Sequence, residues 1–481
     1  MRDSGARLTI PLVVSTAFFV QLLDTTIMMT SLPQMATAFG MRPLDMGLGL
    51  TVYSLVLACA LPLAGWIATR FGAKVVFLAA TGVFLLGSLA CGLAHSFAVF
   101  VAARALQGLG GAAMNPVGRI IVLQTTPRAK LLAANNAITW PGLIAPLAGP
   151  LIGGFVTARF GWRWNFLLNI PIGLACIGLA QKFVPAFAPD RRAFLDAKGF
   201  LLSSTALGAL LFGLGGLCDG APGVAAFAGI AWGIAGGVLA WRHLRVAAHP
   251  VLRLSVLQIP SFRLASLTAG MATRVSISSV AFLLPILLQT VFGFGVVEAG
   301  ACLSAYFAGN FLGIFHVPRV LRRFGFRKVL VVNPLLAGAS LAAMALIVPG
   351  APRAAVWGLL FAAGIIRSIQ FSSQSSLTVA EIPPELNADA STLSSIFLQA
   401  SSSLSVVLST GVLNGAAWLA GEGRPGLAAF RGTFVAMAML SAGAAWFFRA
   451  LPVDAGAEMV GAFSRPPPSV FGSLGGRRGE R

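Results

Sequence analysis

The chain has 481 residues, of which 57% are hydrophobic and 10% are charged, and its 34 Lys and Arg against 14 Asp and Glu give a formal net charge of +20. A soluble domain carries about 25% charged residues, so this composition excludes a soluble globular protein and favours an integral membrane protein. The basic residues fall in short runs between apolar segments, which indicates membrane topology and not a nucleic-acid surface.

Apolar segments long enough to cross a bilayer recur along the whole chain, since one span needs about 20 residues. The sequence predicts fourteen spans: 9–31, 46–67, 75–95, 98–121, 131–156, 164–186, 199–217, 223–241, 264–291, 297–319, 328–348, 354–378, 390–418 and 429–450. The weakest are 199–217 and 223–241, which are short and rich in Gly and Ala, and without them the count is twelve.

The distribution of positive charge tests this topology. With residues 1–8 placed inside, 24 of the 34 Lys and Arg fall in inside loops and tails and 6 in outside loops. This bias obeys the positive-inside rule. We therefore expect both termini in the cytoplasm, cytoplasmic linkers at 187–198 and 242–263, and a disordered tail over 451–481. A bacterial-type inner membrane fits this orientation.

An internal repeat divides the chain into halves. The only two tyrosines, Tyr53 and Tyr306, lie 253 positions apart. The same offset relates an acid-x-Gly segment and an Arg-Phe-Gly segment in the first half to copies in the second: Asp45 to Glu298, Gly47 to Gly300, and 70–72 to 323–325. The repeat predicts six-span bundles at 9–186 and 264–450, with two extra spans at 199–241 between them. Parallel duplicated halves are typical of transporters.

Five segments, taken in order, resemble motifs of the 14-helix drug:proton antiporter branch of the major facilitator superfamily: 23–33, 65–74, 104–111, 145–154 and 162–173. The resemblance covers residues 20–450. It implies the all-α major facilitator fold, with two six-helix bundles and two extra central helices. It also implies proton-coupled export of amphipathic drugs by alternating access, with a small-molecule substrate and protons as partners, in the lipid bilayer. We expect a monomer.

Two of these motifs suggest conformational roles. The inside-loop motif contains Gly65, Arg70, Gly72 and Lys74. Thr69 stands where the family has an acid, so we expect the ionic contact that joins the two halves in the family to be altered in this chain. In the antiporter motif the small residues Ala145, Gly149 and Gly153 recur every four positions and share one helix face, next to Pro150 and Gly154. This face would let a neighbouring helix pack closely and would form a tight seal between the halves. The alternative is that the small residues only allow ordinary helix packing.

Ionisable residues inside spans are few, and they usually mark a pathway because each costs about 2.5–3.5 kcal/mol to insert. They are Asp24, Arg104, Arg274 and Arg367, with Arg119 near an inside end. The first four lie on helices that correspond to the four that line the central cavity in the superfamily. Asp24 and Arg104 lie at similar depth, so we expect them to pair, with Gln107 one turn away. Asp24 is the predicted proton carrier, tuned by Arg104. The alternative is a static buried ion pair.

The substrate prediction concerns Arg274 and Arg367, together with Gln107 and Asn310. The arginines can bind an anionic group or cap backbone carbonyls, and the amides can bind substrate or a neighbouring helix. This leaves open an exporter of organic anions or metabolites, and a membrane receptor or scaffold that transports nothing. With four His, five scattered Cys and no phosphate-binding Gly-Lys-Ser/Thr loop, the sequence indicates no enzyme, catalytic group, metal or cofactor.

Overall fold

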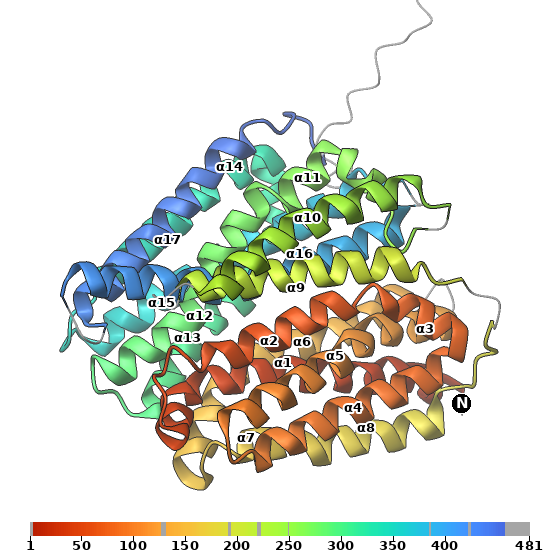
Figure 1. The fold of residues 1–481 in the computed structure, drawn as a ribbon, viewed down its shortest axis with the longest axis horizontal. Coiled ribbons are helices and arrows are strands. Elements are labelled where there is room, and N and C mark those ends of the chain that lie inside the picture. The colour runs from red at the N-terminus through yellow and green to blue at the C-terminus, as the bar shows by residue number, and fades with distance from the viewer. Residues whose placement is uncertain are drawn as a thin grey trace, which may run out of the picture.

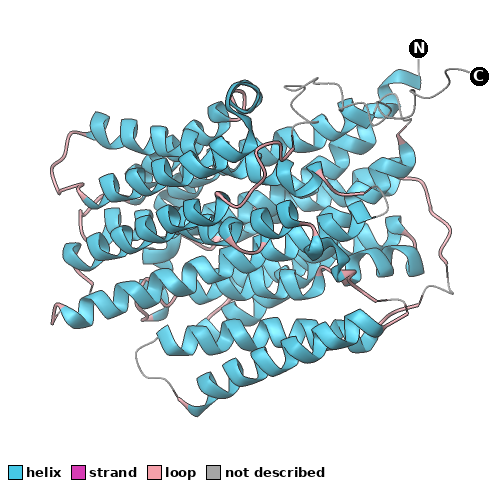
Figure 2. Cartoon of the chain, turned by 90° about the horizontal axis from the view of Figure 1, so that it is seen from above, coloured by secondary structure: helices cyan, strands magenta, loops and turns pink. Residues whose placement is uncertain are grey.

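The computed structural model describes residues 3–126, 131–190, 194–218, 223–248, 250–383, 386–421 and 425–456. Every regular element in these ranges is a helix, and most run roughly parallel to one another (Figure 2). The predicted disordered tail lies outside the described residues from 457 onward.

The first half forms the red to yellow part of the ribbon (Figure 1). Its helices are α1 (Asp3–Phe39), α2 (Gly47–Ala60), α3 (Leu63–Phe71), α4 (Ala73–Leu93), α5 (Phe97–Thr125), α6 (Leu131–Phe160), α7 (Trp164–Leu167) and α8 (Asn169–Phe183). The second predicted span is a bent pair, because α2 and α3 meet at 57°. Helix α6 continues without a break through Pro150 of the antiporter motif.

Two further helices, α9 (Ala197–Cys218) and α10 (Val224–Val246), form a hairpin. The predicted linker 242–263 is more structured than expected, since α10 extends into it and η2 (Leu254–Gln258) and the start of α11 (Pro260–Ser266) lie within it. The second half continues with α12 (Ala269–Thr290), α13 (Val296–Gly313), α14 (Val317–Ala345), α15 (Arg353–Ala380), α16 (Asn387–Leu419) and α17 (Leu427–Phe448).

The chain is a multi-pass membrane protein by the length and hydropathy of its helices. In the described ranges, 11 helices are long and apolar enough to cross a bilayer, or up to 12 if the bent α2–α3 pair counts as one span. Two of the fourteen predicted spans fall short of this test. For α6, only Ile144–Phe160 qualifies, as a shorter apolar helix. The 18-residue helix α13 is not among the 11.

The internal repeat is visible in the backbone. Gly72 and Gly325, which end the two Arg-Phe-Gly segments, both have positive φ, at 89° and 72°. Two positions later, Lys74 Nζ donates to the carbonyl of Gln181 at 2.8 Å, and Arg327 Nη2 donates to the carbonyl of Arg449 at 3.0 Å. Each basic group thus binds the carbonyl end of the last helix of its own half, where the helix dipole favours a cation.

The repeat allows a matched prediction. An alanine at Gly72 or Gly325 must adopt a backbone region that is nearly restricted to glycine, at a cost of about 1–3 kcal/mol. A Cβ at Gly72 would also lie 2.8 Å from the carbonyl oxygen of Phe187, whereas the space beside Gly325 is open. We expect Gly72→Ala to lower the thermal unfolding midpoint more than Gly325→Ala. The control is Gly65→Ala, because Gly65 has open space around it and no positive φ. If the unfolding midpoint fell equally in all three variants, the backbone strain that we assign to Gly72 and Gly325 would be wrong.

The halves meet along two equivalent seams, α2 against α16 and α6 against α13. A Cβ at Gly47 would lie 2.7 Å from Cγ1 of Val406 on α16, and a Cβ at its repeat partner Gly300 would overlap the carbonyl oxygen of Pro150 on α6. The α9–α10 hairpin lies beside the first seam. Its Ser204 hydroxyl donates to the carbonyl of Cys59 on α2 at 2.8 Å.

Candidate functional site

A buried carboxylate occupies the centre of the first half. Asp24 lies on α1, and its side chain is fully buried. Its Oδ2 accepts from Nη1 of Arg104 at 2.5 Å, and its Oδ1 accepts from Nε2 of Gln107 at 3.1 Å and from Nδ2 of Asn169 at 2.8 Å. The pairing expected from helix depth is therefore present, with Gln107 sharing the carboxylate.

The guanidinium of Arg104 is held from several sides. Its side chain is fully buried, Nη1 also donates to Oε1 of Gln107 at 2.7 Å, and Nε donates to the carbonyl of Gly49 at 3.3 Å. Its carbon Cζ lies 4.3 Å from the centroid of the Tyr53 ring. Nη2 is buried without a hydrogen-bond partner among the described residues, so this nitrogen of the guanidinium can still donate a hydrogen bond.

Two residues absent from the sequence-based site complete this network. Ser88 on α4 accepts from Nε2 of Gln107 and from Nδ2 of Asn169, both at 2.8 Å. Asn169 opens α8 and lies within one of the recognised motifs, so its position offered a signal. Ser88 is an ordinary small polar residue of an apolar helix, and nothing in the sequence distinguishes it.

The location of this network differs from the sequence-based expectation. Among the described residues, the side chains that hydrogen-bond to Asp24 or Arg104 come from α1, α5 and α8 of the same half, and both residues are enclosed. The pair thus lies inside the first bundle and not in a hollow shared by the two halves. Helix depth predicted the pairing, but it cannot give the direction in which a side chain leaves the helix.

The arginines predicted to bind substrate lie in the second half. Arg274 on α12 is buried, its Nη1 lies 3.5 Å from the carbonyl oxygen of Ser266, and its Nε has no partner among the residues the structure describes. Arg367 on α15 is half-buried, and its Cζ lies 4.6 Å from the ring centroid of Phe371 and 5.7 Å from that of Tyr306. The two repeat tyrosines therefore each lie beside an arginine.

The four predicted substrate residues do not form one cluster. Arg367, Tyr306 and Ile277 line a cavity of about 10 Å³, room for about one water molecule, and Arg274 is not part of its lining. Gln107 belongs to the Asp24 network in the other half. Asn310 is half-buried on α13, where its backbone nitrogen would lie 2.8 Å from a Cβ at Gly364 of α15.

The antiporter motif on α6 packs against two helices at once. A Cβ at Gly153 would lie 2.8 Å from the carbonyl oxygen of Ile27 on α1, and a Cβ at Gly149 would overlap Thr26. A Cβ at Gly154 would lie 2.9 Å from the carbonyl oxygen of Val296 on α13. One face of the motif thus fits the helix of Asp24, and the adjacent face fits the other half.

Glutamine side chains link the two halves through hydrogen bonds. Nε2 of Gln289 on α12 donates to the carbonyl of Thr30 on α1 at 2.9 Å, and Nε2 of Gln34 donates to Oε1 of Gln289 at 2.9 Å. Thr30 also lies next to Gly153. The contact with Gln289, the residues that pack against Gly149 and Gly153, and Asp24 therefore all lie along α1.

The model of the Major Facilitator Superfamily matches residues 14–406. Among curated proteins, "Putative multidrug resistance protein MdtD" of Pectobacterium carotovorum subsp. carotovorum (strain PC1) is 34% identical over 450 residues, covering 92% of this chain and 95% of that protein. The protein of the same name from Cronobacter sakazakii (strain ATCC BAA-894) is 35% identical over 451 residues, covering 92% and 94%.

Solved structures share the fold at low sequence identity. An auto-inhibited POT family peptide transporter has a TM-score of 0.68 at 16% identity, with 92% of this chain and 96% of that chain covered. A D-xylose-proton symporter has a TM-score of 0.63 at 13% identity, with 93% and 98% covered. These likenesses concern the arrangement of the helices.

Proposed function

Because the chain belongs to the Major Facilitator Superfamily, we propose that it exports amphipathic toxic compounds in exchange for protons, as a transporter and not an enzyme. The names of the relatives, which cover most of both chains, support multidrug export. The proton coupling rests on one observation, the enclosed carboxylate of Asp24 that accepts hydrogen bonds from three donor groups.

The hydrogen bonds of this site couple protonation of Asp24 to a conformational change. An ionised carboxylate only accepts hydrogen bonds, and Arg104, Gln107 and Asn169 all donate to it. A proton on Asp24 adds a donor where donors already converge, and it leaves the buried guanidinium without its anion. Such a state is stable only after the network rearranges. Asp24 and Thr30 both lie on α1, so a rearrangement of the network would also move Thr30 and its contacts with Gln289 and Gly153.

The proposed topology has fourteen spans, with both termini in the cytoplasm of a bacterial-type inner membrane. Helix α6 is 30 residues long and α13 packs against it across a seam, which supports counting both as spans. In this topology, residues 9–186 and 264–450 are the two bundles, and 199–241 contributes the extra hairpin. We propose a monomer as the functional unit.

A narrower exporter of organic anions is the second candidate. Arg274 Nε and Arg367 Nη1 are buried without hydrogen-bond partners among the described residues. No carboxylate in the described ranges lies within 4 Å of either side chain, since neither appears in an ion pair. A substrate carboxylate could therefore satisfy them once the gap between the halves admits it.

The test is transport by inverted membrane vesicles that contain the protein. We expect an imposed proton gradient to drive uptake of a lipophilic dye, with a simultaneous rise of lumenal pH. Uptake without any proton movement would contradict the coupling. Matched cationic, neutral and anionic dyes separate the two candidates, since selective uptake of anions that is lost in Arg274→Gln and Arg367→Gln supports the second candidate.

A further inference from the structure

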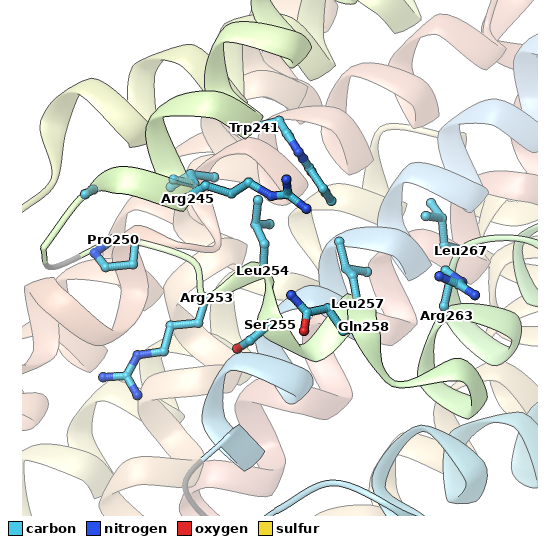
Figure 3. Close-up of a pocket in the computed structure, with 12 residues that line it drawn as sticks. Trp241, Arg245, Pro250, Arg253, Leu254, Ser255, Leu257, Gln258, Arg263 and Leu267 are labelled. Carbon is cyan, nitrogen blue, oxygen red and sulfur yellow. The ribbon is translucent and has the colours of Figure 1, made fainter.

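A large cavity lies away from the Asp24 network, where the hairpin meets the second half. It has a volume of about 490 Å³ and is formed by the end of α10, the turn η2 and the helix α11 (Figure 3). Leu254 and Leu257 supply apolar wall, and Ser255 and Gln258 supply neutral polar groups. No step of the proposed transport cycle uses this cavity.

Three arginines give the cavity a basic rim. Arg245, Arg253 and Arg263 all line it and are exposed. Arg253 lies 3.9 Å from a carboxylate oxygen of Asp389, and Arg245 Cζ lies 4.7 Å from the ring centroid of Trp241. No carboxylate oxygen among the described residues lies within 4 Å of Arg245 or Arg263, because neither occurs in an ion pair. The rim thus has cationic donors available for an anion.

An apolar groove continues from this rim along the hairpin. A second cavity of about 260 Å³ lies between α9 and α10 and shares Trp241, Leu244 and Leu254 with the first. It extends along α10 to Gly237 and Gly233, away from the arginines. A Cβ at Gly237 would meet no atom within 4 Å, so this part of the groove is open space.

The rim is held in place by a buried acid. Asp196 accepts from the backbone nitrogen of Gly199 at 2.8 Å and from that of Val251 at 3.3 Å, and its Oδ1 lies 2.7 Å from Nε2 of His243. Burial acts to raise the pKa of Asp196, but the hydrogen bonds from His243, Gly199 and Val251 outweigh it and hold this pKa below its usual value. These bonds join the start of α9, the end of α10 and the loop before η2.

We propose that this groove binds an anionic phospholipid, with its phosphate at Arg245 and Arg263 and one acyl chain beside Gly237. Basic pockets between helices at the cytoplasmic surface suit anionic headgroups, and a Trp at the same level suits the membrane interface. A free phosphate ion would leave the apolar groove unused. A second copy of this strongly basic chain would place more positive charge against the rim.

The test is native mass spectrometry of the purified full chain, with phosphatidylglycerol and phosphatidylethanolamine titrated separately. We expect saturable binding that favours phosphatidylglycerol. In the double variant Arg245→Gln/Arg263→Gln its affinity should fall about 30-fold, since each basic residue near an anionic surface contributes a factor of about five. Gly237→Leu should also weaken binding, because the new side chain occupies the groove.

Two controls match these variants. Arg242→Gln/Arg319→Gln removes the same charge at positions that do not line the cavity, and Gly215→Leu adds the same side chain at another open position of the hairpin. Both should bind phosphatidylglycerol as the unchanged protein does. Equal binding in all five proteins would overturn the proposal. So would displacement of the lipid by millimolar inorganic phosphate, or a dimer that Gly237→Leu dissociates without loss of lipid.

Discussion

Vesicles containing Asp24→Asn are expected to lose proton-driven dye uptake entirely, to the level of vesicles without the protein. The asparagine keeps the size of the side chain but cannot carry a charge or exchange a proton. It also leaves the guanidinium of Arg104, which is fully buried, without its anion. Removing one partner of a buried ion pair costs about 3–5 kcal/mol, so a lower thermal unfolding midpoint should accompany the loss of transport.

A second variant separates the proton role from the structural role. Asp24→Asn/Arg104→Gln removes both charges, and neutral replacement of a buried pair is often tolerated. We expect this double variant to regain most of the lost stability while proton movement in the vesicle assay stays absent. If it regained both stability and proton-driven uptake, Asp24 and Arg104 would form a static ion pair and the proposed coupling would be wrong.

Gly300→Val is expected to damage the protein more than any other Gly→Val change at the seams. A Cβ at Gly300 would overlap the carbonyl oxygen of Pro150, which is backbone and can move only if α6 and α13 separate. Overpacking of this kind costs about 1–3 kcal/mol, and sometimes more. We expect a lower unfolding midpoint and slower dye uptake, measured on the same vesicle preparation.

The repeat supplies the comparison for this variant. At the equivalent Gly47, the nearest atoms belong to the side chains of Val406 and Phe282, which can adjust, so Gly47→Val should have a smaller effect. Gly358→Val is the control for helix propensity, because a Cβ at Gly358 meets no atom within 4 Å. Equal losses in the three variants would show that the closeness of the seams does not limit the protein.

The halves of the fold could be predicted because a duplicated sequence repeats the same local requirements. An Arg-Phe-Gly corner needs a glycine with positive φ, and Gly72 and Gly325 both meet that requirement. The segment 242–263 was predicted only as a linker, since η2 and α11 are too short to show a periodic apolar pattern. Pro260 at the first turn of α11 was the available signal.

The candidate site was predictable in part for a related reason. Charge is rare inside a membrane, so Asp24 and Arg104 stood out, and their similar depth predicted that they pair. In the structure their side chains are 2.5 Å apart. The rotation of each helix about its axis decides whether that contact faces the other half or its own bundle. It depends on how Ser88 and Asn169 pack from neighbouring helices, and single small polar residues carry no such information in a sequence.

The seam between α6 and α13 includes two close approaches of main chain to main chain, Gly154 against Val296 and Gly300 against Pro150. Surfaces of this kind have few interlocking side chains to disengage, and one helix can roll on the other without opening voids. In the proposed transport cycle, protonation of Asp24 would therefore need to supply only a small difference in free energy to move α6 against α13.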